Sequence, residues 1–337
     1  MHFESSEAFS AALAAFPGPD IAAREAASAR QSQLTKPAGS LGRLEEIALF
    51  MAGWQGKERP ALDKARAVIF AGNHGVTRHG VSAFPADVTV QMVANFEAGG
   101  AAINQLAREA GMELRIVALD LDRPTADFTE SAAMTVEECL DALNHGAASV
   151  EPGLNLLAVG EMGIGNSTAA AALCAHSLGG DVRDWVGPGT GLDPAGEARK
   201  VAVVERALAT HADAPRNAFE TLRRLGGREI AAIAGAVLAA RHMRVPVMLD
   251  GFIACAALAP LVAQQPALAE HCLAGHCSAE PGHRRLLHHF SLTPLLQLGM
   301  RLGEGSGAAV AVPIVRAALA THNGMATFAE ASVAGKL

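Results

Sequence analysis

Short apolar runs alternate with longer amphipathic stretches through most of the chain after about residue 65. The clearest runs cover residues 67–71, 114–119, 154–159 and 245–249, and Ala-rich segments with helical spacing lie between them. Strands that alternate with helices build βαβ crossovers, in which neighbouring strands run parallel. The pattern therefore predicts an α/β fold with a mainly parallel, Rossmann-like sheet flanked by helices.

Both ends of the chain show helical periodicity instead. Residues 6–56 form three helical pieces, broken at Pro17-Gly18-Pro19 and again before Ser40, which is placed to cap the third piece. The chain after Asp250 is largely helical again and ends with a helix over 303–320 and a short tail helix. We expect the ends to pack together as a small discontinuous helical domain, residues 1–60 plus about 290–337, beside a large α/β catalytic domain, residues 61–290.

The composition fits a large buried core. Half of the 337 residues are hydrophobic, 34 are glycine and only 4% are aromatic, which suits close packing of helices on a sheet. The net charge is −7 and the basic residues are scattered, so the chain offers no basic stripe for nucleic acid. Nucleic-acid binding is therefore not expected.

The expected compartment is the cytoplasm. No run of about 18 apolar residues could span a membrane, and the N-terminus has no basic segment that leads into an apolar one. The five cysteines are odd in number and include no Cys-x-x-Cys pair, which is typical of reduced thiols.

A glycine-rich turn at residues 160–168 follows one predicted strand and precedes an Ala-rich helix. Its glycines permit close approach of the backbone, and the amides of a helix capped by Asn166, Ser167 or Thr168 could hold an anion. Glu161 places a carboxylate at this turn. The spacing matches neither the Walker A motif nor the dinucleotide fingerprint, so the alternative is a simple structural turn.

Two further segments carry candidate chemistry. The glycine-rich loop 187–193 precedes a helix that begins near Pro194 and carries Lys200, which is either a solvated side chain or a point charge for a phosphate. Glu304 lies among glycines and apolar residues at a helix start, where it either complements the helix dipole or, in an apolar pocket, serves as a general base.

Histidines near Cys277 suggest a metal site, but their spacing matches no zinc signature, and Gly and Pro interrupt the segment. Asp120 and Asp122 follow a strand, but Arg123-Pro124 makes a surface turn the simpler interpretation. No nucleophile elbow is present. We therefore predict no metal and no cofactor.

Motifs spread along nearly the whole chain resemble one family, the nicotinate-nucleotide–dimethylbenzimidazole phosphoribosyltransferases, and they follow that family's order. The matching segments are 36–45, 73–76, 80–82, 88–92, 160–168, 186–193, 226–230, 249–251, 276–283 and 298–307. The resemblance implies transfer of the phosphoribosyl group from nicotinate mononucleotide to 5,6-dimethylbenzimidazole, which releases nicotinate and forms α-ribazole 5′-phosphate. It also implies a parallel α/β domain, a small helical domain and a homodimer whose partner contributes to the site.

The resemblance assigns roles to single residues. Glu304 resembles the proton acceptor for the azole, and Glu161 resembles a second active-site carboxylate. The expected phosphate-binding residues are Gly163, Gly165, Asn166 and Lys200, with Gly189 and Thr190 as candidates to join them. The expected benzimidazole-binding residues are Ser82, Gln91 and Leu302. His74, Arg228 and Asp250 are expected near the site without an assigned role.

Two other classes of function remain open at this point. One is a nucleotide-binding protein without catalysis, against which the presence of both Glu161 and Glu304 argues. The other is a metal-dependent hydrolase built on the histidine-rich segment 271–289.

Overall fold

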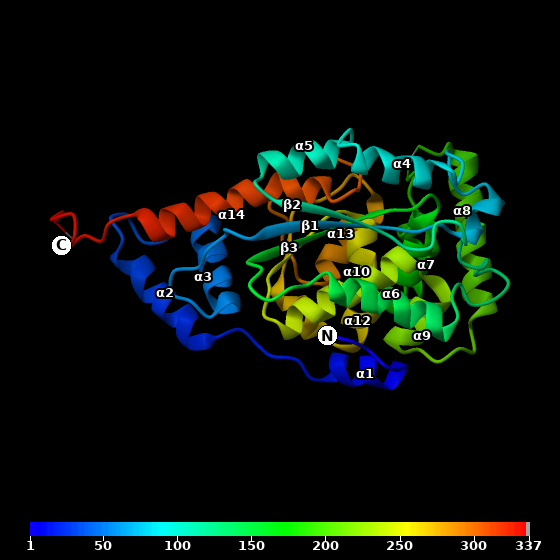
Figure 1. The fold of residues 1–337 in the computed structure, drawn as a ribbon, viewed down its shortest axis with the longest axis horizontal. Helices are drawn as coiled ribbons and strands as arrows, with labels where there is room; N and C mark the ends of the chain where they lie inside the picture. The colour runs from blue at the N-terminus through cyan, green and yellow to red at the C-terminus, as the bar shows by residue number, and fades with distance from the viewer. Residues whose placement is uncertain (190, 335–337) are drawn as a thin grey trace.

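A five-stranded parallel sheet forms the centre of the molecule (Figure 1). The computed structural model describes residues 1–189 and 191–334. The strands lie in the order β2-β1-β3-β4-β5 and comprise β1 Ala65–Ala71, β2 Glu113–Ala118, β3 Leu156–Met162, β4 Val247–Leu249 and β5 Cys272–Ala274. The predicted α/β class and parallel sheet are confirmed, whereas β5 was not predicted.

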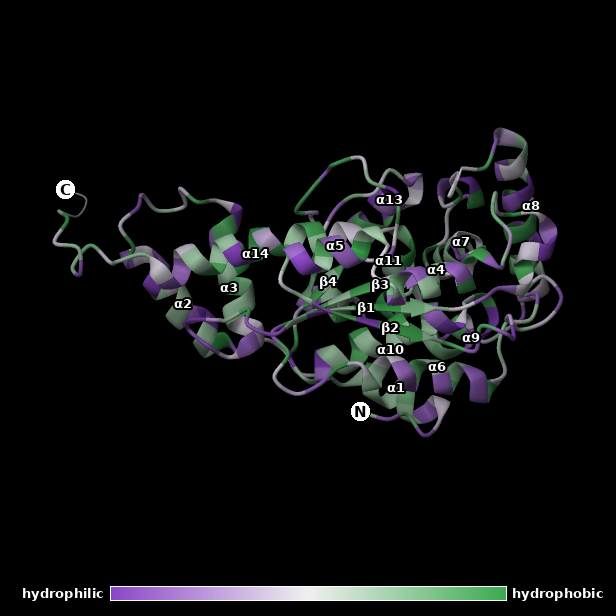
Figure 2. Ribbon diagram, turned by 45° about the horizontal axis from the view of Figure 1, so that its top comes forward, coloured by the Kyte–Doolittle hydropathy of each residue, from purple (hydrophilic) through white to green (hydrophobic). Residues whose placement is uncertain are grey.

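Helices cover both faces of the sheet. Figure 2 shows hydrophobic strands at the centre and hydrophilic stretches on outer helices such as α8. The longer helices are α1 Ser6–Ala14, α2 Ile21–Gln33, α3 Arg43–Gln55, α4 Val88–Glu97, α5 Ala102–Glu109, α6 Val136–Ala148, α7 Asn166–Leu178, α8 Pro194–Thr210, α9 Ala218–Leu225, α10 Arg228–His242, α13 Pro281–His289 and α14 Ser306–Gly324. Two short helices, α11 Phe252–Ala256 and α12 Ala259–Gln264, follow β4, and 3-10 turns span Gly75–His79, Val182–Asp184 and Pro266–His271.

Alternate residues of β1 enter two separate cores. Val68 and Phe70 belong to the core that includes residues of α6, α7 and α10, whereas Ala67 and Ile69 belong to the core that includes residues of α3, α5 and α14. All of β1 is buried, as expected for a strand covered on both faces, and apart from the ion-paired Arg66 its sequence is apolar, with a continuous run over residues 67–71. This burial explains why the strand was readable from the sequence.

The helices α6 and α10 approach each other closely through glycine. A Cβ atom at Gly146 would overlap the carbonyl group of Ala232, and one at Gly235 would overlap that of Leu143. Neither glycine has a positive φ, so their role here is to remove side-chain volume. In the resulting helix pair α10 packs directly on β1 and β3, and α6 packs on α10.

The two chain ends meet beyond the amino-terminal edge of the sheet. There α3 packs against α2 and α14, and the Arg30 side chain donates hydrogen bonds to the carbonyl groups of His322 and Met325. In Figure 1 this group extends away from the sheet, but α1 lies elsewhere and packs on α9. The division of the chain near residues 60 and 290 stays a prediction.

Several local predictions at the ends are wrong. Gly42, not Ser40, is the N-cap of α3, and no side chain caps that helix. The last helix begins at Ser306 and runs on to Gly324, and the described residues after it form turns instead of a tail helix.

Candidate active site

A cleft lies at the carboxyl ends of β3, β4 and β5, where ligands bind in open parallel sheets. The chain adds β2 on one side of β1 and then adds β3, β4 and β5 on the other side. The order of strand addition therefore reverses at β1, next to this cleft. The cleft is lined by Glu161, Met162, Gly163, Ile164, Asn166, Ser167, Gly189, Gly251, Phe252, Ile253, His276, Ser278, Glu280, Arg301, Leu302, Gly303 and Glu304.

The turn between β3 and α7 forms one wall of the cleft. Gly165 has φ +92°, which favours glycine, and it serves as the N-cap of α7. The prediction that Asn166, Ser167 or Thr168 caps α7 is wrong, because no side chain caps that helix end. The Asn166 side chain instead donates a 2.5 Å hydrogen bond to Oε2 of Glu161.

Lys200 is a buried cation beside this wall. Although it lies on the long helix α8, its side chain is only 1% exposed, so it is not a solvated surface residue. Its Nζ donates 3.0 Å hydrogen bonds to the Ser167 hydroxyl and to the Gly187 carbonyl oxygen. Burial lowers the pKa of Lys200, and the charge of Glu280 opposes that shift.

The loop before α8 joins Lys200 to the cleft. The Gly189 amide donates a 3.1 Å hydrogen bond to Oε1 of Glu280, and burial raises the pKa of that carboxyl. A cation, a carboxyl group and glycine backbone therefore meet where a phosphate is expected. Thr190, predicted to join this group, lies outside the described residues.

Glu161 sits at the base of the cleft, near the end of β3, and is 6% exposed. Burial raises the pKa of Glu161 to about 8; the hydrogen bond from Asn166 opposes this shift, and the nearby carboxyl groups of Asp250, Glu229 and Glu304 reinforce it.

Glu304 lies in the turn before α14, not within the helix. Its own φ is +60°, and the flanking Gly303 and Gly305 also have positive φ. Glu304 is 6% exposed, and burial raises its pKa to about 7, with a further rise from the charge of Asp250. A carboxyl group with such a pKa can accept a proton near neutral pH.

The structure brings most of the predicted residues together. Glu161, Gly163, Asn166, Gly189, Leu302 and Glu304 line the cleft, and Lys200 contacts Ser167 in its wall. Gly165 is not among the residues that line the cleft; it packs against the side chains of His74 and Thr77.

Ser82 and Gln91 are not among the residues that line the cleft. Ser82 precedes α4, where its hydroxyl accepts a hydrogen bond from the Phe84 amide, and Gln91 is an exposed residue of α4 itself. The α4 helix is nevertheless tied to the cleft, because the Thr89 hydroxyl accepts a hydrogen bond from the Ile164 amide.

Several cleft residues had no predicted role. Phe252 and Ile253 lie outside the matching segments, whereas His276, Ser278, Glu280 and Arg301 lie within segments 276–283 and 298–307. Some of them follow β5, a strand of three residues that gives no periodic signal. The rule that ligands bind after parallel strands would have pointed to them if β5 had been recognised.

Within the histidine-rich segment, His276 lines the cleft, whereas His283 serves packing and hydrogen bonding. His283 is buried, with its Nε2 3.3 Å from the Cys255 sulfur and its Nδ1 2.9 Å from the Ser278 amide nitrogen. Across residues 1–189 and 191–334, no three His, Cys, Asp or Glu side chains are grouped in a way that could hold a metal ion. Within the same residues, no helix has the length and apolar character needed to cross a membrane.

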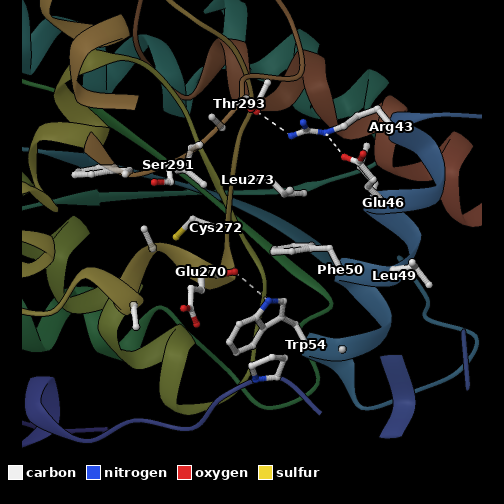
Figure 3. A pocket seen from close by; sticks show the side chains of 18 of the residues that line it. Arg43, Glu46, Leu49, Phe50, Trp54, Glu270, Cys272, Leu273, Ser291 and Thr293 are labelled. Carbon is white, nitrogen blue, oxygen red and sulfur yellow. Dashed lines mark hydrogen bonds and ion pairs between the residues drawn. The ribbon is translucent and has the colours of Figure 1, made fainter. Parts of the chain in front are cut away.

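A larger cavity of about 770 Å³ lies along the edge strand β5 (Figure 3). Its walls include Phe50 and Trp54 of α3, and the Trp54 indole donates a 3.2 Å hydrogen bond to the Glu270 carbonyl oxygen. Arg43 reaches across it to the Thr293 carbonyl oxygen. None of the predicted site residues lines this cavity, so the cleft is the candidate site.

Comparisons with known proteins agree with this site. A family model described as "Phosphoribosyltransferase" matches residues 16–333. The nicotinate-nucleotide–dimethylbenzimidazole phosphoribosyltransferase of Novosphingobium aromaticivorans is 71% identical over 99% of both chains, and the enzyme of the same name from Ruegeria pomeroyi is 58% identical over 95% of both. A crystal structure of CobT from Thermus thermophilus superposes with a TM-score of 0.88 at 42% identity, over 94% of this chain and 100% of that one. The chain belongs to the nicotinate-nucleotide–dimethylbenzimidazole phosphoribosyltransferase family.

Proposed function

We propose that the protein transfers the phosphoribosyl group of nicotinate mononucleotide to 5,6-dimethylbenzimidazole, giving α-ribazole 5′-phosphate and nicotinate. The observation that carries the proposal is that Glu304 and Glu161 line one cleft together with the turn between β3 and α7, which Lys200 contacts through Ser167. We call this turn and Lys200 the Lys200 wall. The names of the relatives supply the identity of the substrates.

The reaction needs one displacement at C1′ of the ribose. The unprotonated azole nitrogen attacks C1′ from the face opposite nicotinate, and the bond from C1′ to the pyridinium nitrogen breaks with its electron pair returning to nicotinate. The β-linkage thereby becomes an α-linkage. The N–H proton of the azolium product passes to the Glu304 carboxylate, whose pKa of about 7 suits a base at neutral pH.

Glu161 has a different task in this proposal. Its pKa of about 8 keeps it largely protonated at neutral pH, so it presents a neutral carboxyl group to the nucleotide. It also fixes Asn166 through their short hydrogen bond. Glu304 therefore acts as the base, and Glu161 as an orienting group.

The 5′-phosphate is proposed to bind at the Lys200 wall. Gly163 and Gly165 would let the backbone approach the phosphate closely, and Asn166 would contribute an amide group. Gly189, in the loop before α8, would contact the phosphate from the other side. The apolar acceptor is proposed to bind towards Leu302, with Ser82 and Gln91 contributing from the α4 side. The leaving nicotinate carries no pyrophosphate, so the reaction needs no divalent cation to stabilise a departing phosphate.

A chromatographic assay tests this function. Purified protein is mixed with nicotinate mononucleotide and 5,6-dimethylbenzimidazole in excess EDTA, and nicotinate and α-ribazole 5′-phosphate are followed together, with a control that lacks the azole. We expect both products in equal amounts and none without the azole. Nicotinate alone would indicate a hydrolase, and no product would favour a binding protein.

We also propose a homodimer in which the partner covers the cleft. Exposed apolar side chains occur on both segments that flank it, namely Phe84 and Val90 at α4 and Leu298 and Leu302 before α14. Large apolar groups around a substrate site favour cover by another surface. A cytoplasmic location is proposed as well, because all five cysteines are free and buried.

A further inference from the structure

The Glu304 turn has an unusual backbone that must be held from outside. Gly303, Glu304 and Gly305 have φ values of +80°, +60° and +72°, so three successive residues occupy the left-handed region. Glycine adopts this conformation readily, but glutamate does not. Backbone of this kind persists where surrounding contacts determine it.

Asp250 supplies such contacts from a distant part of the chain. It follows β4 directly and is 1% exposed. Its Oδ2 accepts a 3.1 Å hydrogen bond from the Gly305 amide, and its Oδ1 accepts a 2.9 Å bond from the Ala308 amide in the first turn of α14. One carboxylate therefore joins the end of β4 to both the Glu304 turn and the helix behind it.

We propose that Asp250 is a positioning residue for Glu304: its carboxylate pins the turn through these amides and keeps a second negative charge behind the Glu304 carboxylate. The proposal rests on the proposed role of Glu304 as the base. It adds that a residue that does not line the cleft increases the proton affinity of this base beyond the effect of burial.

The electrostatic surroundings support this role. Burial raises the pKa of Asp250, while His276, with its Nε2 3.6 Å from Oδ1, and the amides of the α14 start favour the charged form. The charge of Asp250 then raises the pKa of Glu304 beyond the effect of burial. Other titratable or charged groups around the pair are Glu161 on β3, with Glu229 of α10 behind it, Cys255 on α11 and Arg301 before the turn.

The test is the pH profile of kcat for Asp250→Asn in the full-length protein. This change preserves the side-chain shape and one acceptor oxygen but removes the charge. We expect the acid limb of the profile to move down on the order of one pH unit, because a nearby like charge is lost. Asp141→Asn removes a similar charge from an exposed position on α6 and should leave the limb in place.

A second comparison identifies the group that responds. Glu304→Gln cannot ionise at this position, so its residual activity should show no acid limb in this range, whether residue 250 is Asp or Asn. If the limb persists in Glu304→Gln and still moves with residue 250, the responding group is not Glu304, and the inference is wrong.

The outcomes separate the inference from the proposed function. If the wild-type protein forms no product, the proposed function fails. If Glu304→Gln retains its rate, the base assignment fails and the inference fails with it, while the proposed transfer stands. If Glu304→Gln is slow but Asp250→Asn lowers kcat without moving the limb, Asp250 is merely structural, and only the inference fails. Asp250→Ser provides a second uncharged side chain, and loss of native circular dichroism in both variants would likewise assign a merely structural role.

Discussion

Glu161 and Glu304 occupy one cleft but have different surroundings. Glu161 is bonded to Asn166 and has three carboxyl groups near it, whereas burial and Asp250 account for the shift of Glu304. Burial thus brings both carboxyl groups into the neutral range, with a pKa of about 7 for Glu304 and about 8 for Glu161. Replacing each carboxyl group in turn tests which of them is the base.

Replacing Glu304 by Gln should lower kcat by about 10²–10⁴-fold, the usual contribution of a general base, while nucleotide binding persists. In the wild-type protein kcat should rise with pH and reach half its plateau near pH 7, because only the ionised carboxylate accepts the proton. The measurement is steady-state kinetics from pH 5 to 9 together with calorimetric binding of the nucleotide. A near-normal rate in Glu304→Gln would transfer the role to Glu161.

Replacing Lys200 by Met should weaken nucleotide binding, because the substitution keeps the apolar stem and removes the charge. A hydrogen bond to a charged group contributes about 1.5–3 kcal/mol, so the KM for nicotinate mononucleotide should rise by roughly 10–100-fold with a smaller change in kcat. Arg199→Met, at the exposed neighbouring position, serves as the control. A loss confined to kcat would contradict phosphate binding by Lys200.

At the scale of elements, the close packing of α6 on α10 depends on Gly146 and Gly235, which have no side chain at the helix contact. Gly235→Ala should reduce the free energy of unfolding by about 1–3 kcal/mol, because the added methyl group overlaps the backbone of α6 at Leu143. Urea denaturation measures this loss. Gly324→Ala, at the open end of α14, is the matched control and should be close to neutral.

The predictability of the elements follows their length and their range of contacts. β1 and β3 each bury a long apolar run between two helix layers, so they were readable from the sequence alone. β4 and β5 each have three residues, but β4 lies in the apolar run 245–249, whereas β5 lies between His271 and Gly275 and belongs to the sheet only through its pairing with β4.

The site residues divide in the same way. The glycine turn with Glu161 and the glycines around Glu304 are local signals, and both were recognised. The hydrogen bonds from the Gly305 and Ala308 amides to Asp250 join residues more than 50 positions apart. The Asn166 side chain donates a hydrogen bond to Glu161 and does not cap α7. Such contacts depend on tertiary packing, so the expected cap at Asn166 was wrong and Asp250 had no assigned role.

At the scale of the whole molecule, the apolar rim of the cleft predicts self-association. Sedimentation at micromolar concentration should give about twice the chain mass of 34.6 kDa. Leu298→Glu combined with Val90→Glu should shift the protein towards monomers, because both side chains are exposed at the rim. Val136→Glu, at an equally exposed position on α6, should not do so. A monomeric wild-type protein would contradict the proposed dimer.

The left-handed backbone at Glu304 has a consequence for laboratory evolution of this enzyme. A non-glycine residue in that region costs roughly 1–2 kcal/mol, so Glu304→Gly should unfold at a higher temperature than the wild-type protein. A library selected for heat resistance alone would therefore enrich a substitution that removes the proposed base. Screens that couple heating to product formation would be needed to keep the most stable clones active.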